Sequence, residues 1–283
     1  MPGRRTDLSQ HFLRRGALAA RLVSSSSITS RDRVLELGAG TGALTGELAK
    51  RCGQLWAVEI DPRLCHALEC RFHGDRRVRV VRGDLLSFSL PGAGPYKVFA
   101  NLPFHLTSPA LRRLAEAERP PEDAYVIVQR EAAQRYAGGP YAPETLLSLR
   151  LKPWWQIEIL GRIARRDFQP PPSVDCAFLW LARRTRPLVE AREKRLYRDF
   201  VSASFGRRGT ALRDGLRGLL SPHQIRRLAR ELRFDPGDPP SALGFEQWLG
   251  IYRFFADRAG PAERRRVRGA ERRLPRGPKL RGD

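Results

Sequence analysis

The tetrapeptide Asn101-Leu102-Pro103-Phe104 carries groups that suit a reaction at a planar amine. The exocyclic amine of adenine is a poor nucleophile because its lone pair is delocalised into the ring. The side-chain carbonyl of Asn101 and the backbone carbonyl of Leu102 can accept hydrogen bonds from that amine and favour attack by the lone pair. Pro103 stiffens the turn, and Phe104 can stack on an extruded base. If the amine is methylated by a sulfonium cofactor, whose methyl group is intrinsically transferable, the site needs mainly to position the reactants. We therefore expect no general base.

A glycine-rich loop lies upstream, between an apolar run and a helical pattern. Gly38, Gly40 and Ala43 satisfy the spacing of a dinucleotide-binding loop. Gly38, Gly40 and Gly42 equally satisfy the tighter loop of methyltransferases that use S-adenosyl-L-methionine. The loop alone therefore leaves both cofactors open.

Two acidic residues follow the next two apolar runs. Both candidate cofactors contain a ribose, and the carboxylate of Glu59 can accept hydrogen bonds from both ribose hydroxyls. In a methyltransferase, Asp84 would meet the adenine amine of the cofactor, although an isolated Asp here is typical of a turn. A hydride-transfer enzyme has no use for the tetrapeptide at Asn101. The combination therefore favours S-adenosyl-L-methionine over a nicotinamide cofactor.

Phe168 is a second candidate for stacking on the target base, opposite Phe104. Its alternative role, a buried anchor of a hairpin, is equally open. The histidines show no ligand spacing, and the cysteines fit neither a zinc site nor a disulfide framework. We therefore expect no metal and reduced thiols.

The elements that position these residues alternate between short apolar runs and longer helical patterns. Such alternation predicts βαβ units and a mainly parallel sheet, with the last two strands as an antiparallel pair at one edge. The expected strands are 34–37, 55–58, 78–81, 97–100, 125–128, 156–163 and 177–181.

Beyond residue 187 the sequence indicates helices only. Ser221 and Gln224 form a capping box with Pro222 at the first helical position, and apolar residues from Phe245 to Phe255 share one helical face. Residues 259–283 are rich in Arg and poor in apolar residues, which predicts a disordered basic tail that binds RNA. The expected organisation is an N-terminal segment (1–30), a catalytic domain (31–186), a helical RNA-binding domain (187–258) and the tail (259–283).

The overall charge indicates a polyanionic partner. The chain has 283 residues, with 52 Lys and Arg against 30 Asp and Glu, a net charge of +22. This favours nucleic acid over a membrane surface. We expect no transmembrane helix and, because no apolar run follows the basic residues of the first dozen, no signal peptide.

Taken together, the motifs resemble the ribosomal RNA adenine N-6 methyltransferases over about residues 7–255. The motifs that carry the resemblance are Ser9-Gln10-His11-Phe12-Leu13, Leu35–Gly42, Val58-Glu59-Ile60-Asp61, Gly83-Asp84, Asn101–Phe104 and Phe168–Val174. One branch of the family is the erythromycin-resistance methylases (Erm), which act on large-subunit rRNA, and the other is the KsgA enzymes, which act on small-subunit rRNA. The segment Phe245–Leu249 and the Arg-rich tail resemble Erm more closely.

The resemblance implies a Rossmann-like, seven-stranded class I methyltransferase sheet followed by a small all-helical domain. Gln10 and Leu13 would border S-adenosyl-L-methionine, while Gly38 and Gly40 lie beside its methionine portion. Glu59 would hold the ribose and Asp84 the adenine of the cofactor. Asn101 would also contact the cofactor. The remaining roles, binding of the target base and its reaction, would fall to Asn101, Leu102, Phe104 and Phe168. Many relatives have Tyr where this chain has Phe104, so the ring face would matter more than a hydroxyl.

The implied reaction is N-6 methylation of one adenine in the macrolide-binding region of large-subunit (23S) rRNA. The implied consequence is resistance to macrolides, lincosamides and streptogramin B. The enzyme would act as a cytoplasmic monomer on nascent or protein-poor RNA. The alternatives are a KsgA-type small-subunit enzyme and a non-catalytic RNA-binding factor on the same fold, and a dehydrogenase is remote.

Overall fold

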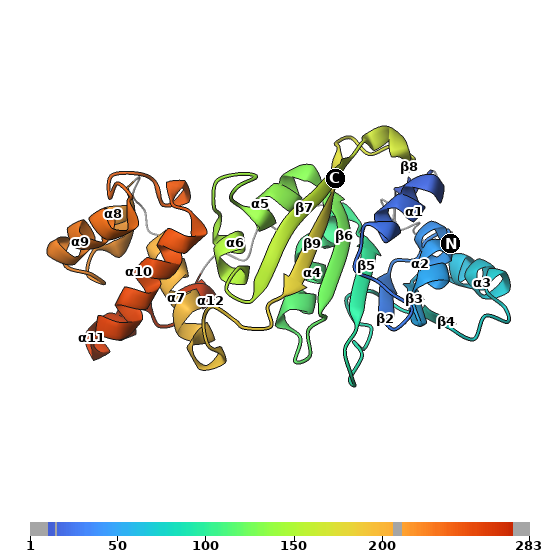
Figure 1. The fold of residues 1–283 in the computed structure, drawn as a ribbon, viewed down its shortest axis with the longest axis horizontal. Helices are drawn as coiled ribbons and strands as arrows, with labels where there is room; N and C mark the ends of the chain where they lie inside the picture. The colour runs from blue at the N-terminus through green and yellow to red at the C-terminus, as the bar shows by residue number, and fades with distance from the viewer. Residues whose placement is uncertain (1–10, 15, 206–210, 274–283) are drawn as a thin grey trace, which may run out of the picture. The chain divides into compact units, whose positions relative to one another are not determined.

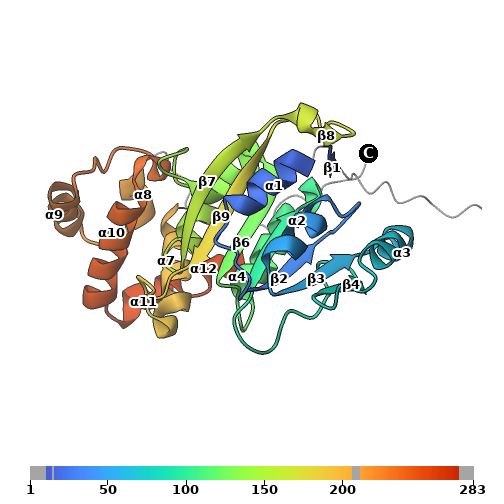
Figure 2. The same ribbon diagram turned by 45° about the vertical axis from the view of Figure 1, so that its right-hand side comes forward.

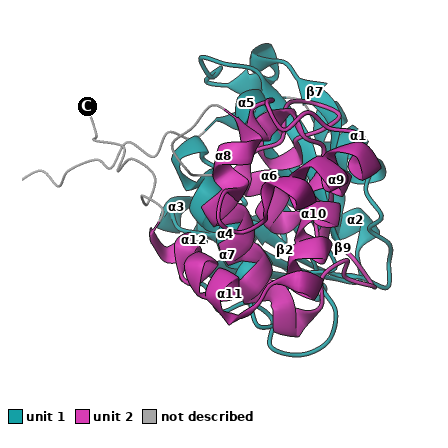
Figure 3. Cartoon of the chain, turned by 90° about the vertical axis from the view of Figure 1, so that its left-hand side faces the viewer, with its two compact units in different colours: residues 1–133, 157–183 teal, residues 134–156, 184–283 magenta. Residues whose placement is uncertain are grey.

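The computed structural model describes residues 11–14, 16–205 and 211–273. The chain divides into two compact units (Figure 3). The first contains residues 1–133 and 157–183, and the second contains residues 134–156 and 184–283. Each unit is described separately below.

The first unit is built on a seven-stranded sheet in the order β4-β3-β2-β5-β6-β9-β7 (Figure 1). Pairing is parallel from β4 to β6 and antiparallel between β6 and β9. The expected α/β fold with a mainly parallel sheet is confirmed, and the last two strands adjoin at one edge. The strands are β2 (Arg33–Leu37), β3 (Gln54–Glu59), β4 (Val78–Arg82), β5 (Lys97–Asn101), β6 (Asp123–Gln129), β7 (Trp155–Ile163) and β9 (Cys176–Arg183).

Helices pack on this sheet because their apolar faces match those of the strands. On one face, α1 and α2 lie side by side (Figures 1 and 2). They bury Leu22 and Leu48 against Phe99, Tyr125 and Phe178 of the strands. The helices of this part of the chain are α1 (Gly16–Ser24), α2 (Ala43–Arg51), α3 (Pro62–Arg71), η1 (Phe104–Leu106), α4 (Thr107–Glu116), α5 (Arg130–Ala137) and η2 (Arg165–Asp167). No described helix is long and apolar enough to cross a membrane.

A small second sheet joins two segments that are far apart in sequence. β1 (Phe12–Leu13) pairs antiparallel with β8 (Phe168–Gln169), with Phe12 opposite Gln169 and Leu13 opposite Phe168. The pairing places the segment before α1 beside the connection between β7 and β9.

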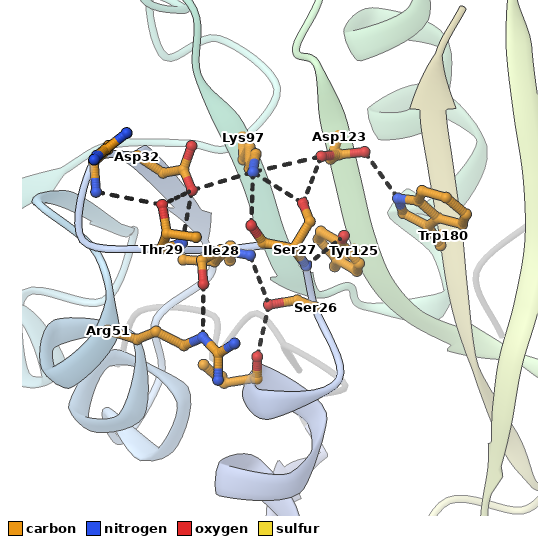
Figure 4. A network of polar contacts seen from close by, with 12 residues as sticks. Ser26, Ser27, Ile28, Thr29, Asp32, Arg51, Lys97, Asp123, Tyr125 and Trp180 are labelled. Carbon is orange, nitrogen blue, oxygen red and sulfur yellow. Dashed lines mark hydrogen bonds and ion pairs between the residues drawn. The ribbon is translucent and has the colours of Figure 1, made fainter.

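A partly buried polar network fastens the connection after α1 to the amino ends of β5 and β6 (Figure 4). The ammonium group of Lys97 donates to the Ser27 carbonyl at 2.9 Å and lies 3.1 Å from a carboxylate oxygen of Asp32 and 3.7 Å from one of Asp123. Asp123 also accepts from the indole of Trp180 at 2.9 Å. The Lys97 side chain is only 10% exposed, so its charge depends on these partners.

The second unit is helical and has its own core. Tyr197, Phe200, Trp248, Tyr252 and Phe255 are its largest fully buried side chains. The expected capping box is confirmed, since the Ser221 hydroxyl accepts from the Gln224 amide at 3.2 Å and Gln224 accepts from the Ser221 amide at 2.8 Å. The helices are α6 (Leu146–Leu151), η3 (Ala191–Glu193), α7 (Lys194–Phe205), α8 (Leu212–Leu216), α9 (Pro222–Leu232), η4 (Pro240–Ala242), α10 (Phe245–Arg258), α11 (Pro261–Val267) and α12 (Ala270–Arg273).

The expectation of a disordered tail from residue 259 is wrong for residues 261–273, which form α11 and α12. Val267 is fully buried in the core of the second unit, and the carboxylate of Asp199 on α7 accepts from the amides of Gly269 and Glu271. The buried Val267 and the buried carboxylate of Asp199 therefore hold residues 261–273 in a folded conformation, although the composition of this segment is typical of a disordered tail. Residues 274–283 lie outside the described residues.

The expected domain boundaries also need one correction. Residues 134–156, which we placed inside the catalytic domain, belong to the second unit. Leu149 is fully buried in the core of that unit, and its carbonyl accepts from the hydroxyl of Tyr197 at 2.8 Å.

We predict that Lys97→Met lowers the free energy of unfolding by about 3 kcal/mol, because it leaves two largely buried carboxylates without their cation. Burial by itself raises the pKa of Asp32, but hydrogen bonds from Thr29 and Lys97 outweigh it and lower that pKa. The stability that Asp32 contributes is thus present at neutral pH and is lost as the pH falls below about 4.

Urea unfolding of both proteins at pH 7 and at pH 3.5 checks this prediction, with a smaller gap expected at the lower pH. Lys50→Met is the control, because Lys50 is 71% exposed in its pair with Glu47 and should contribute less than about 0.5 kcal/mol. Equal effects of the two substitutions would contradict the assigned role of Lys97.

Candidate functional site

A cavity lies where the parallel strands of the first unit end. Because β2, β3, β4 and β5 all run in one direction, the loops that follow them meet at one edge of the sheet (Figure 1). The cavity is lined by His11, Phe12, Gly38, Gly40, Val58, Glu59, Ile60, Gly83, Asp84, Leu85, Asn101, Leu102, Pro103, Phe104, His105, Leu106 and Phe168.

The glycine loop after β2 takes a backbone conformation that other residues rarely adopt. Gly38, Gly40 and Gly42 have φ angles of 76°, 56° and 80°. A Cβ atom on Gly40 would lie 2.8 Å from the ring of Phe12. Glycine is therefore required here for its positive φ angle and for the close approach of the Phe12 ring from β1. Because glycine has no side chain, a ligand can also approach the backbone of the loop closely.

Glu59, at the end of β3, holds this loop in place. One carboxylate oxygen accepts from the Gly40 amide at 2.7 Å, and the other accepts from the amides of Ile60 and Asp61 at 2.8 and 2.9 Å. The residue is 2% exposed, so these bonds compensate for the burial of its charge. Sequence reasoning predicted a ribose-binding carboxylate here and missed its role in organising the loop. A carboxylate has about four acceptor sites, so both roles are compatible.

Asp84 follows β4 and is half-buried in the cavity wall. One of its carboxylate oxygens accepts from the Leu86 amide at 2.8 Å, which stabilises the turn. The turn role considered from sequence is therefore present. The second oxygen is available for the predicted contact with an adenine amine.

A second buried acid lies close to the loop but does not line the cavity. Glu36 in β2 is 1% exposed. Burial raises its pKa to about 8, and the negative charge of Glu59 adds to this shift. Burial therefore favours the neutral form of Glu36, and of these two acids only Glu59 lines the cavity.

Asn101, the last residue of β5, has its amide group fixed in orientation. Its side-chain NH₂ donates to the backbone carbonyl of His11 at 2.7 Å. The side-chain oxygen, which lies on the other arm of the amide, is then free to accept from an incoming amine. Leu102 is buried, and its own amide donates to the carbonyl of Ile127 at 3.2 Å, which fixes the backbone on which the second predicted acceptor lies.

The two aromatic candidates differ in accessibility. Phe104 is half-buried on the cavity wall, and its ring centroid lies 5.4 Å from that of His11. Phe168 also contributes to the wall, but it is only 1% exposed and belongs to the core cluster of the first unit. The structure thus favours the buried hairpin anchor for Phe168 and leaves Phe104 as the ring that can present a face.

The segment around β1 differs in part from expectation. Leu13 is buried in the core and does not line the cavity, whereas its neighbours His11 and Phe12 do. Gln10 lies outside the described residues. Sequence reasoning assigned no role to His11, because its contribution to the site is a backbone carbonyl, which residue types do not reveal.

Ile60 is another residue that sequence reasoning missed. It lines the cavity and is 46% exposed, which is high for such an apolar side chain. Its position directly after Glu59 was the available signal. An exposed Ile on a cavity wall offers an apolar surface for a flat ring.

The described residues contain no cluster that could hold a metal ion, and the four cysteines are unpaired. By contrast, the hydrogen-bond acceptors present fit S-adenosyl-L-methionine. Gly40, where a Cβ would collide with the Phe12 ring, lines the same cavity as two acids with remaining acceptor capacity, Glu59 and Asp84, which suit the ribose hydroxyls and the adenine amine of that cofactor. Ile60 and Leu85 add apolar walls.

Comparison with known proteins connects this geometry to a family. The sequence model of the family described as "Ribosomal RNA adenine dimethylase" matches residues 2–257. The mycinamicin-resistance protein MyrB of Micromonospora griseorubida is 34% identical over 281 residues, which cover 96% of this chain and 88% of MyrB. Ribosomal RNA small subunit methyltransferase A of Dehalococcoides mccartyi is 33% identical over 250 residues, which cover 86% of each chain. The crystal structure of the 23S rRNA methyltransferase ErmE superposes with a TM-score of 0.81 at 29% identity, covering 87% of this chain and 99% of that structure.

We predict that Glu59→Ala lowers the affinity for S-adenosyl-L-methionine at least tenfold. The substitution removes hydrogen bonds to a carboxylate, which are worth about 1.5–3 kcal/mol each, and also loosens Gly40. Titration calorimetry measures the affinity. Glu36→Gln is the matched control, because burial favours the neutral form of this nearby acid, which lies outside the cavity, and the variant should bind like the wild type. A folded Glu59→Ala protein with unchanged affinity would remove the ribose role.

We predict that Asn101→Ala abolishes measurable turnover while leaving cofactor affinity nearly intact, because the Asn101 side-chain oxygen is the predicted acceptor for the target amine. Phe104→Ala should lose about 1–3 kcal/mol of base stacking, seen as a fall in kcat/KM for RNA. Phe104→Tyr is the control that keeps the ring face and should remain active. Wild-type turnover by Phe104→Ala would exclude the stacking role.

Proposed function

The chain belongs to the ribosomal RNA adenine dimethylase family, and from that premise we propose that it methylates N-6 of one adenine in large-subunit (23S) rRNA. The observation that carries the choice of subunit is the superposition with the 23S rRNA methyltransferase ErmE at a TM-score of 0.81 and 29% identity. The match to MyrB supports it, because this match extends over 96% of the chain, while the match to the small-subunit enzyme covers 86%.

S-adenosyl-L-methionine supplies an activated methyl group when bound, and the protein's own residues do the rest. Glu59 and Asp84 bind the cofactor through their remaining acceptor sites. Asn101 and Leu102 accept from the two hydrogens of the adenine amine, so that the lone pair turns toward the methyl group. The carbonyl of His11 acts through Asn101 by fixing the orientation of its amide.

Phe104 receives the target base after it leaves its stack. Extrusion of a base costs a few kcal/mol and is easiest at a loop or junction. Stacking on the Phe104 ring offsets part of this cost. We therefore propose that the enzyme acts on nascent or protein-poor RNA, because ribosomal proteins would bury the surface around the target. We further propose that it works as a cytoplasmic monomer.

The expected consequence is resistance to macrolides, lincosamides and streptogramin B. The name of MyrB, a mycinamicin-resistance protein, supports this consequence. The competing proposal is a small-subunit methyltransferase, which the match to the Dehalococcoides enzyme supports. A non-catalytic RNA-binding factor is disfavoured, because the proposed hydrogen-bond acceptors for the cofactor and for the target base all line one cavity.

Incubation with labelled S-adenosyl-L-methionine and both ribosomal RNAs tests the proposal. We expect label in the large-subunit RNA, mapped to one adenine by primer extension, and faster methylation of free RNA than of intact subunits. Expression in a susceptible bacterium should raise the inhibitory concentration of a macrolide and a lincosamide, and the Asn101→Ala variant should not. Label confined to small-subunit RNA, without resistance, would decide for the competing proposal.

A further inference from the structure

The second unit contains a hollow of about 330 Å³ whose lining is mostly arginine. It lies among η3, α7 and α11 and the turn that follows α11. Its polar lining consists of five arginines and one aspartate: Arg192, Arg195, Arg264, Arg265, Arg268 and Asp199. An ordinary surface intersperses charges of both signs, so this concentration of one sign requires an explanation.

The one acid in the lining serves the backbone of the protein. Asp199 is 4% exposed, and its two carboxylate oxygens accept from the amides of Gly269 and Glu271 at 2.8 and 3.1 Å. This contact ties the turn between α11 and α12 to α7. Asp199 therefore fixes the arginines of α11 opposite those of α7 and does not form an ion pair with them.

Several arginines of the hollow have guanidinium N–H donors that are available to a ligand. In the described part of the chain, the guanidinium groups of Arg195, Arg265 and Arg268 are exposed and have neither a hydrogen bond nor an ion pair. Arg264 is fixed by bonds to the carbonyls of Ala256 and Ala259 at the end of α10. Three unpaired cations around one hollow repel each other, and an anion that bridges them would relieve that repulsion.

We infer that this hollow is a phosphate-binding site for the backbone of the RNA substrate. The planar guanidinium fork matches a phosphate oxygen pair and favours phosphate over a single carboxylate. The inference rests on the proposed function only in that the substrate is RNA. It gives the segment 261–273 a defined role, because its folding places three arginines in a fixed site.

The test compares two variants that each remove two positive charges from the second unit. Arg195→Gln with Arg265→Gln removes two unpaired arginines of the hollow. Arg226→Gln with Arg230→Gln, on the exposed side of α9, is the matched control. Binding is measured on a hairpin transcript that contains the unmodified target adenine, at several KCl concentrations.

For the hollow variant we expect RNA affinity to fall about tenfold at 0.1 M KCl. The slope of log K against log salt should become shallower by about 0.7 for each phosphate of a single strand that the variant no longer neutralises. The KM for RNA should rise with kcat and cofactor affinity unchanged. The control should keep both slope and affinity close to wild type. Arg195→Lys with Arg265→Lys keeps the charge and should keep the slope while losing part of the affinity.

Equal effects of the hollow variant and the control would overturn the inference in favour of net charge alone. Unchanged RNA binding by the hollow variant would also overturn it. Binding of inorganic phosphate to the hollow without any change in the salt slope would assign the site to a free anion. If the label maps to small-subunit RNA, the hairpin is taken from that RNA and the same comparison applies, so this inference and the choice of subunit fail separately.

Discussion

The parallel pairing of β2, β3, β4 and β5 decides where the glycine loop, the two acids Glu59 and Asp84 and the Asn101 amide lie in the cavity. Parallel strands end at the same edge, so Gly38, Glu59, Asp84 and Asn101 converge although they span more than sixty residues of sequence. The same arrangement buries two acidic side chains, Glu59 and Glu36. Three backbone amides compensate for the burial of the Glu59 carboxylate, whereas burial of Glu36 outweighs what Thr45 offers it and drives Glu36 toward its neutral form.

β5 connects the two polar centres of the first unit. Its first residue, Lys97, neutralises two carboxylates at the amino edge of the sheet, and its last residue, Asn101, presents its amide at the carboxyl edge. The same network holds Ser27, just after α1, while the pairing of β1 with β8 holds the segment just before α1. The chain that carries His11 is thus fastened on both sides of α1. This double attachment allows one carbonyl to fix the Asn101 amide.

Sequence reasoning predicted the parts of the fold and site that depend on local pattern. Apolar runs predicted the strands, and Gly, Glu and Asn at strand ends predicted the cavity. It could not predict contacts made by backbone atoms, such as the carbonyl of His11, because any residue type supplies them. It also failed where one or two buried residues determine the structure of a segment whose overall composition predicts something else. Val267 and Asp199 order a segment that is otherwise basic and polar, and Leu149 joins its segment to the core of the second unit. The burial of Phe168 and of Leu13 follows from the pairing of β1 with β8, whose two short strands carry no pattern of their own.

The charge of the protein and the chemistry of its cavity make different contributions to the recognition of one adenine in an RNA. Extruding an adenine costs a few kcal/mol, and stacking on a single ring returns about 1–3 kcal/mol, so the cavity alone holds a target base weakly. Contacts to phosphates carry no sequence information, yet they supply affinity that can meet this cost. A net charge of +22 spread over a mobile surface would supply such affinity to any RNA. Arginines fixed by a folded segment do more, because they hold the backbone in one register relative to the unit that carries them. Selection of one adenine then requires both a base that leaves its stack easily and a backbone whose shape fits the fixed cations.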